Sequence, residues 1–197
     1  MEVYLDNAAT TSVCPEVRDA MLAALNDTYG NPSSLHRKGL DAELALREAR
    51  ASVAGVLRVQ EKEVFFTSGG TESNNWAIIG GARAKCRQGR HLITSAIEHP
   101  SAAEAFRFLE QEGFEVTVLP VNGEGLIEPE TLANALRPDT VLVSLMAVNN
   151  EIGTVEPLAE LAAVVKKNDP QTLFHTDTVQ AFGKIQLYPK SLGADLV

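Results

Sequence analysis

One short stretch has the composition of an anion-binding turn, with two glycines and several hydroxyl side chains: Ser68-Gly69-Gly70-Thr71-Glu72-Ser73. The apolar residues before it, 64–66, predict the end of a buried strand, and the residues after it predict a helix that begins at Thr71. A helix start presents unpaired backbone N–H groups and the positive end of the helix dipole, and glycine lets an anion approach the backbone closely. The stretch therefore predicts a phosphate site, with an ordinary capped turn as the alternative.

Four further polar residues stand shortly after predicted strands. Ligands of open α/β sheets bind beyond the carboxyl ends of the strands, so these positions can share one site. An imidazole at His99 could stack on an aromatic ring, and the Asp177 carboxylate could accept a hydrogen bond from a pyridinium N–H and keep that nitrogen protonated. Asn150 and Gln180 could donate to a phenolic oxygen on the same ring. Together these roles describe pyridoxal 5′-phosphate.

Each of these residues also has an ordinary structural explanation. Asp177 could cap the segment that follows it, and His99 could cap a helix that starts near Ser101. Asn149 and Asn150 are typical turn residues. Any one of these explanations is sufficient for its residue, whereas polar groups at successive strand ends favour a shared cofactor site.

The elements that must position these residues follow from the hydrophobic pattern. Short apolar segments alternate with helical ones, which indicates βαβ units and a mostly parallel sheet with helices on both faces. We therefore predict a three-layer α/β/α fold. The predicted strands are 64–66, 91–95, 115–119, 141–146 and 172–175, and the predicted helices between them are 71–84, 101–112, 130–136 and 157–167. Residues 1–57 are predicted to form an N-terminal arm with helices, and residues 58–197 the cofactor-binding α/β domain.

Composition narrows the class of protein. The formal net charge of −9 argues against a nucleic-acid-binding surface and against a basic membrane patch. No apolar run approaches the ~20 residues of a membrane helix, and the first residues lack the pattern of a signal peptide. Cys14 and Cys86 lie far apart and predict free thiols rather than a disulfide or a metal site. We expect a cytoplasmic protein that binds neither membrane nor nucleic acid.

Six motifs, in order along almost the whole chain, resemble those of one enzyme family. The chain resembles the N-terminal half of a cysteine desulfurase, in the class V aminotransferase group of fold-type-I pyridoxal-phosphate enzymes. The matching stretches are 4–11 (YLDNAATT), 30–36 (GNPSSLH), 67–74 (TSGGTESN), 98–99 (EH), 148–153 (VNNEIG) and 175–180 (HTDTVQ). Each motif is weak alone, and the ordered set is specific.

The resemblance implies roles for the same residues. Gly70 and Thr71 would bind the cofactor phosphate, and the four residues after the strands would take the ring contacts described above. His99, which stacks on the ring, is the one implied catalytic residue. Asn7, Ala8 and His36 belong to loops that lie in the family near the substrate or near a site built by two subunits.

The sequence departs from the family pattern at its end. In the family, the lysine that attaches the cofactor stands in a Ser-x-His-Lys motif, which would follow shortly after Val197, and the cysteine that accepts sulfur lies further on. Lys184 and Lys190 do not stand in that motif, and Cys14 and Cys86 do not correspond to that cysteine. We therefore expect the 197-residue chain to be poorly stable and inactive by itself.

The function that the resemblance implies is the conversion of L-cysteine to L-alanine. The sulfur would pass to an enzyme cysteine as a persulfide and then to iron–sulfur cluster or thio-cofactor assembly, through sulfur-acceptor or scaffold proteins. The resemblance also implies a homodimer. Three alternatives stay open: a selenocysteine lyase or other class V enzyme, a non-catalytic remnant, and a nucleotide- or sugar-phosphate-binding domain that needs neither His99 nor Asp177.

Overall fold

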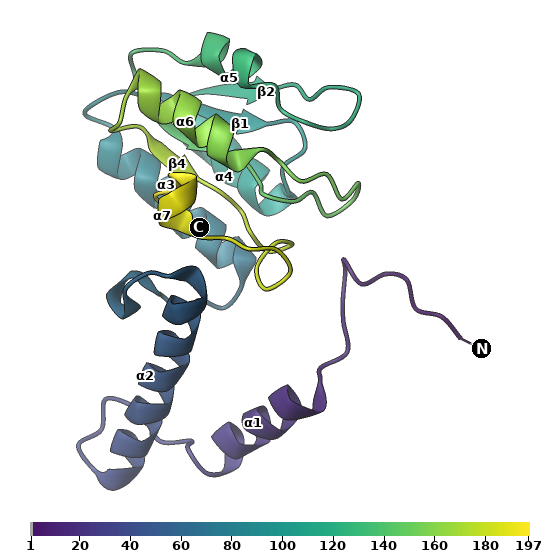
Figure 1. Ribbon diagram of the computed structural model, residues 1–197. Helices are drawn as coiled ribbons and strands as arrows, with labels where there is room; N and C mark the ends of the chain where they lie inside the picture. Colours follow the sequence, from purple (N-terminus) through teal and green to yellow (C-terminus); the bar gives the residue numbers. More distant parts are fainter. Residues whose placement is uncertain (1) are drawn as a thin grey trace. The chain divides into compact units, whose positions relative to one another are not determined.

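The computed structural model describes residues 2–197 and separates into two compact units, Met1–Phe65 and Phe66–Val197. The N-terminal unit contains α1 (Pro15–Asn26), α2 (Arg37–Leu57) and the short 3-10 helix η1 (Glu61–Glu63) (Figure 1). Proline at the first turn is compatible with a helix start, as it is at Pro15. Helices predicted within residues 1–57 are thus present, as α1 and α2.

The second unit carries the alternating pattern that the sequence predicts. Its strands are β1 (His91–Ser95), β2 (Glu115–Leu119), β3 (Thr140–Ser144) and β4 (Leu173–His175). Its helices are α3 (Gly70–Lys85), α4 (Pro100–Gln111), α5 (Pro129–Ala135), α6 (Leu158–Asn168) and α7 (Pro189–Leu192). The strands lie in the order β2-β1-β3-β4, and each neighbouring pair is parallel.

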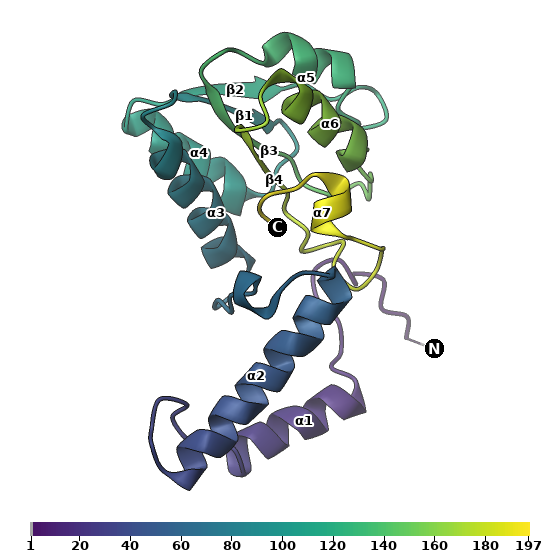
Figure 2. The ribbon, with the colours of Figure 1, turned by 60° about the vertical axis from the view of Figure 1, so that its left-hand side comes forward.

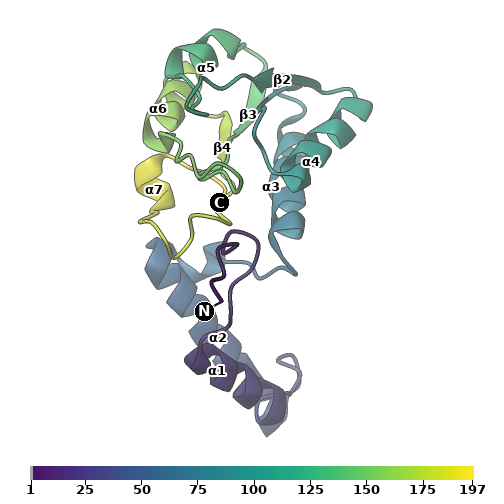
Figure 3. The same cartoon turned by 90° about the vertical axis from the view of Figure 1, so that its right-hand side faces the viewer.

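Successive residues of the central strands face opposite layers of helices. Leu92 and Leu142 pack with α3 and α4, whereas Ile93 and Val143 pack with α5 and α6. This alternation is the period of two that a strand imposes on its side chains. Figures 2 and 3 show α3 and α4 on one side of the sheet and α5 and α6 on the other. The predicted three-layer α/β/α fold is confirmed.

One predicted strand is wrong. Residues 64–66 belong to none of the four strands, although the backbone at Val64 is extended. Phe65 and Phe66 are 71% and 48% exposed, so this apolar run is not a buried strand. A strand needs a neighbour for its backbone hydrogen bonds as well as suitable side chains. The helix after the turn also begins one residue earlier than predicted, at Gly70.

The last residues of the chain lie beside the fourth strand. Leu196 pairs with His175 in an isolated parallel bridge, and Asp195 Oδ2 accepts a hydrogen bond from the Phe174 N–H at 2.7 Å. Lys166 of α6 donates to the same carboxylate at 2.5 Å. The end of the chain is therefore joined both to the sheet and to the helix that covers it.

Between residues 2 and 197, none of the helices combines the length and the apolar character that crossing a bilayer requires.

Candidate functional site

The candidate site is built where parallel strands end side by side. β1 ends at Ser95, β3 at Ser144 and β4 at His175, and β3 lies between the other two. Because parallel strands end at the same edge of a sheet, the segments that follow them start close together. These are the segments that carry His99, Asn150, Asp177 and Gln180.

The predicted phosphate turn leads into α3 as the sequence implies. Gly69 is the N-cap, and Ser73 N–H makes the first hydrogen bond of the helix, to the Gly69 carbonyl at 3.1 Å. The preceding N–H groups, at Gly70, Thr71 and Glu72, lie in the turn where a helix has no internal partners for them. This helix start has the donors for an anion, and its dipole favours negative charge there.

A carboxylate already braces the same turn. Glu72 Oε2 accepts hydrogen bonds from the Ser68 backbone N–H at 2.6 Å and from Ser68 Oγ at 2.7 Å. The bond from the Ser68 N–H, followed by the one from its hydroxyl, lowers the pKa of Glu72 below its ordinary value. Thr67 Oγ1 and Ser73 Oγ lie 2.8 Å apart across the turn. These contacts hold the shape of the loop.

Gly70 brings the helix start against the segment that carries Asp177. A Cβ at Gly70 would lie 2.8 Å from Val179 Cγ2, closer than real Cβ contacts allow. A larger residue at Gly70 would fit only if the Val179 side chain moved away. The structure thus places the predicted phosphate turn next to the predicted partner of the ring nitrogen.

Asp177 is held from two sides. It is 8% exposed, and its Oδ1 accepts from the Val179 N–H at 2.9 Å while its Oδ2 accepts from Asn74 Nδ2 at 2.7 Å. The bond to Val179 is the local capping contact that the sequence offered as an alternative role. Each carboxylate oxygen has two lone pairs, so the group can accept a further donor.

His99 is the N-cap of α4. Its Nδ1 accepts from the Ser101 N–H at 3.1 Å and lies 2.8 Å from Ser101 Oγ. The capping role that the sequence offered as an alternative is therefore present. It does not exclude stacking, because His99 is exposed and its ring faces are not used by these in-plane hydrogen bonds.

Asn150 and Gln180 make contacts within their own loops. Asn150 Nδ2 donates to Glu151 Oε1 at 2.9 Å, and Gln180 Oε1 accepts from Lys184 Nζ at 3.1 Å. The turn after β3 is held instead by the buried Asn149, whose Oδ1 accepts from the Glu151 N–H at 2.8 Å. Asn150 and Gln180 lie in segments that follow strands at the same edge of the sheet as Asp177. Their role toward a ring oxygen stays a prediction.

Two polar residues of the quoted motifs, Asn74 and Glu98, received no role from the sequence and lie at this edge. Asn74 occupies the buried stripe of α3 together with Ile78 and Ala82, so a polar residue on an apolar face was the available signal. Glu98 joins two strand ends, since its Oε1 accepts from Ser95 Oγ at 2.6 Å and from the Met146 N–H at 2.9 Å. Burial raises the pKa of Glu98 to about 7, against the opposing effect of these two hydrogen bonds.

Two other histidines belong to the core. His175 is 1% exposed, and its Nδ1 lies 2.7 Å from Ser144 Oγ. Burial lowers the pKa of His175 to about 4, so the ring is neutral near pH 7. His91, at the start of β1, bonds to Thr140 Oγ1 at 2.7 Å, and burial is the main cause that lowers its pKa. Across residues 2–197, no cluster of histidine, cysteine and acidic side chains is suited to a metal ion.

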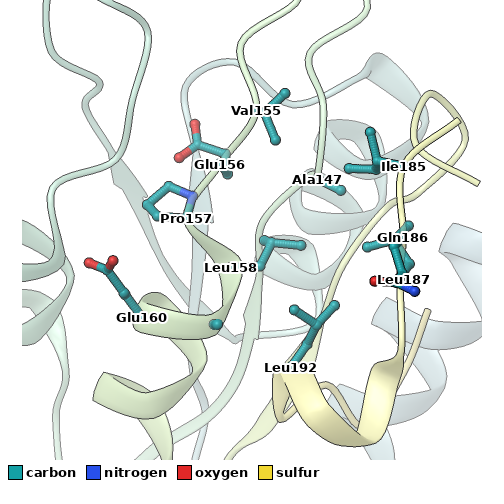
Figure 4. A pocket seen from close by; sticks show the side chains of 11 residues that line it. Ala147, Val155, Glu156, Pro157, Leu158, Glu160, Ile185, Gln186, Leu187 and Leu192 are labelled. Atoms are coloured by element: carbon teal, nitrogen blue, oxygen red, sulfur yellow. The ribbon is translucent and has the colours of Figure 1, made fainter.

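A pocket elsewhere in the α/β unit does not contain the predicted residues. It lies between the start of α6 and the segment before α7, and Figure 4 shows Leu158, Ile185 and Leu192 among its apolar lining. It is lined by none of the six residues predicted to hold the cofactor. We therefore place the candidate site at the strand-end edge and not in this pocket.

The chain has close relatives among known proteins. Residues 3–197 match the aminotransferase class-V family. The chain is 49% identical over 196 residues to a cysteine desulfurase IscS of Dictyoglomus turgidum, and 48% identical over 195 residues to one of Methanosarcina thermophila. These alignments cover 100% and 99% of this chain but 49% and 48% of the two relatives. The chain thus spans about half the length of the relatives it matches.

Solved structures agree with the sequence relatives. A NifS-like protein superposes with a TM-score of 0.95 at 42% identity, over 99% of this chain and 53% of that one. The protein SspA, solved in complex with cysteine, superposes with a TM-score of 0.92 at 38% identity, over 98% of this chain and 55% of that one. The resemblance drawn from the motifs is confirmed: the chain belongs to the aminotransferase class-V family and corresponds to the N-terminal half of its cysteine desulfurase relatives.

Proposed function

We propose that this chain is the cofactor-binding part of a pyridoxal-phosphate-dependent cysteine desulfurase. The observation that carries the proposal is the buried Asp177 carboxylate, held next to the start of α3 by the close approach of Gly70 and Val179. A helix start suits a phosphate, and a carboxylate with spare lone pairs suits a pyridinium N–H. The donor set therefore fits this cofactor.

Each site residue receives a role in this proposal. Backbone groups at Gly70 and Thr71 would bind the phosphate, and Asp177 would hold a proton on the ring nitrogen. Asn150 and Gln180 would contact the oxygen on the ring. We propose residues 58–197 as the cofactor-binding domain and residues 1–57 as an N-terminal arm, and a cytoplasmic location for the whole protein.

His99 is the proposed catalytic residue, since its ring would contact the cofactor. Stacking would exclude water from one face of the ring and fix the plane in which the cofactor lies. The Nδ1 atom accepts from the Ser101 N–H, so the ring hydrogen of neutral His99 lies on Nε2. That N–H can donate a hydrogen bond to a bound substrate.

When bound, the cofactor supplies a protonated ring that accepts electrons from a substrate carbon. In the proposed reaction the C–S bond of L-cysteine breaks, and the sulfur joins an enzyme cysteine thiolate to form a persulfide. The electron pair left on carbon takes up a proton, which gives L-alanine. The sulfur would pass to acceptor or scaffold proteins for iron–sulfur cluster or thio-cofactor assembly, and the working enzyme would be a homodimer.

The proposed cysteine substrate agrees with the names of the relatives, which are cysteine desulfurases, and with the solved complex of SspA with cysteine. A selenocysteine lyase is the second candidate, because the described site residues do not distinguish sulfur from selenium. By itself, we expect the 197-residue chain to release no sulfide from L-cysteine, since the family's lysine and sulfur-accepting cysteine have no counterpart in it. Sulfide release by the purified chain would contradict this expectation.

The direct test is to titrate the chain with pyridoxal 5′-phosphate and to measure binding by absorbance and fluorescence. Asp177→Asn keeps the shape of the side chain and removes its charge, so we expect affinity to fall by about tenfold or more. Asp169→Asn is the matched control, because Asp169 Oδ1 accepts from the Gln171 N–H at 2.8 Å in the same local geometry. Equal affinities for Asp177→Asn and the unchanged chain would favour a general phosphate-binding domain.

A further inference from the structure

A buried polar connection joins the three segments that meet at the candidate site. Asn74, on the buried face of α3, is 3% exposed. Its Nδ2 donates to Asp177 Oδ2 at 2.7 Å and to Ser101 Oγ at 2.9 Å. Ser101 Oγ in turn lies 2.8 Å from His99 Nδ1. One side-chain amide thus links α3 both to the start of α4 and to the segment after β4.

The direction of these hydrogen bonds follows from the chemistry of the groups. A carboxylate oxygen only accepts, so Asn74 must face Asp177 with its Nδ2, and both Nδ2 hydrogens are then used. Ser101 Oγ accepts one of the two Nδ2 hydrogens of Asn74, so the hydroxyl hydrogen of Ser101 remains available for His99 Nδ1. If the amide of Asn74 turned over, its oxygen would face the carboxylate oxygen of Asp177 and that bond would be lost, so Asp177 fixes the orientation of the amide and Ser101 uses its second hydrogen.

A carboxylate held at one oxygen still has freedom to rotate. The terminal torsion of aspartate is broad, and the Val179 N–H holds only Oδ1 of Asp177, at 2.9 Å. Asn74 holds the other oxygen. Two donors on two different oxygens define the plane of the group, and that plane decides where its remaining lone pairs point.

We propose that Asn74 is a positioning residue that fixes the plane of the Asp177 carboxylate for its contact with the ring nitrogen of the cofactor. The contact with the ring rests on the proposed function, whereas the fixing of the carboxylate rests only on its hydrogen bonds with Asn74 and Val179. Loss of the Asn74 amide leaves a buried carboxylate oxygen without its donor, which costs more than the bond itself contributes. The carboxylate then turns, and the Val179 N–H loses a fixed acceptor.

The first experiment uses the cofactor-free chain and hydrogen exchange measured by NMR. The Val179 amide reports on the carboxylate, and the Leu142 amide in β3 reports on the stability of the sheet. In Asn74→Ala we expect Val179 to exchange about tenfold faster relative to Leu142. Asn75→Ala is the matched control, since Asn75 is the next residue of α3 and its Nδ2 donates to the Thr71 carbonyl at 2.7 Å. An unchanged ratio in Asn74→Ala overturns the proposal.

A measurement on the unaltered chain covers the case in which Asn74→Ala does not fold. Both Nδ2 hydrogens of Asn74 are bonded and buried, so we expect them to exchange at least tenfold more slowly than those of Asn75. Equal exchange at the two side chains overturns the proposal.

The second experiment separates positioning from a merely structural role. Pyridoxal 5′-phosphate is compared with its analogue that has carbon in place of the ring nitrogen, for which Asp177 has no partner. We expect Asn74→Ala to weaken binding of the cofactor about tenfold and to leave binding of the analogue unchanged. Equal weakening of both overturns the positioning role. If the unaltered chain binds neither, the proposed function fails, and hydrogen exchange still decides the role of Asn74.

Discussion

The two compact units have similar helical patterning and very different burial. In the N-terminal unit, α1 has no buried residue, and α2 buries only Gly39, Ala42 and Ala54. Large apolar side chains such as Leu25 and Leu44 are 70% and 49% exposed. In the α/β unit, residues of the same kind form two closed clusters around the sheet. Helical periodicity therefore creates an apolar face, and only a packing partner removes that face from water.

Titratable groups show the same contrast. In the α/β unit, Glu98 and His175 are withdrawn from water. Burial raises the pKa of Glu98 and lowers the pKa of His175, and both shifts favour the neutral form of the group. Asn74 and Asp177 at the candidate site are buried as well, and an electrostatic contact between buried groups is stronger than one at the surface. The α/β unit thus contains both the packed core and the candidate site, and substitutions in the two units test this difference.

The largest effect is expected from opening the core. Phe174 in β4 is fully buried, so Phe174→Ala should lower the free energy of unfolding by about 3–5 kcal/mol. The control in the other unit is Leu44→Ala, where an exposed side chain is removed and a change within about 0.5 kcal/mol is expected. Urea denaturation followed by circular dichroism measures both. Equal losses would show that the two units do not differ in this way.

The next effect concerns the pH dependence of stability. Glu98 has a pKa of about 7 in the folded chain and an ordinary value of 4.5. Between these values the folded chain keeps a proton that the unfolded chain has released, so this group lowers stability by about 3 kcal/mol as pH rises from 4.5 to 7. Glu98→Gln should remove this loss, which denaturation at a series of pH values measures.

His175 acts in the opposite direction. Its pKa is about 4 in the folded chain against 6.5 ordinarily, so between these values only the unfolded chain binds the proton and stability rises with pH. The two trends offset each other in the unaltered chain. Glu98→Gln should therefore show stability rising from pH 4 to 6.5, and His175→Gln should show it falling from pH 4.5 to 7. Parallel profiles for the two variants would contradict this explanation.

The smallest effect compares the same helix cap in both units. His36 Nδ1 accepts from the Gly39 N–H at 3.2 Å at the start of α2, and His99 Nδ1 accepts from the Ser101 N–H at 3.1 Å at the start of α4. Replacing either by alanine should cost about 1 kcal/mol. In His36→Ala we expect the loss to appear as faster hydrogen exchange of the backbone amides in the first turn of α2. In His99→Ala we expect it to appear as a lower midpoint for the unfolding of the α/β unit. A lower midpoint in both variants would argue that the units unfold together.

Much of the fold and part of the site were predictable from local patterns. The four strands from His91 onward and the helices between them follow from periodicity and from proline at helix starts. The run 64–66 failed as a strand because β propensity does not supply a pairing neighbour. The helix start at Gly70 was predictable to within one residue, since turn and capping residues act over a few positions.

By itself, the sequence determined the layers, the family and which segments end at the carboxyl edge, because those depend on residue order and on short-range preferences. Only the tertiary structure decided how the polar groups meet. Asn74 and Asp177 are 103 positions apart, and no local pattern records that one donates to the other. The protonation of Glu98 was likewise decided by burial, which arises only when strands and helices from distant parts of the chain exclude water together.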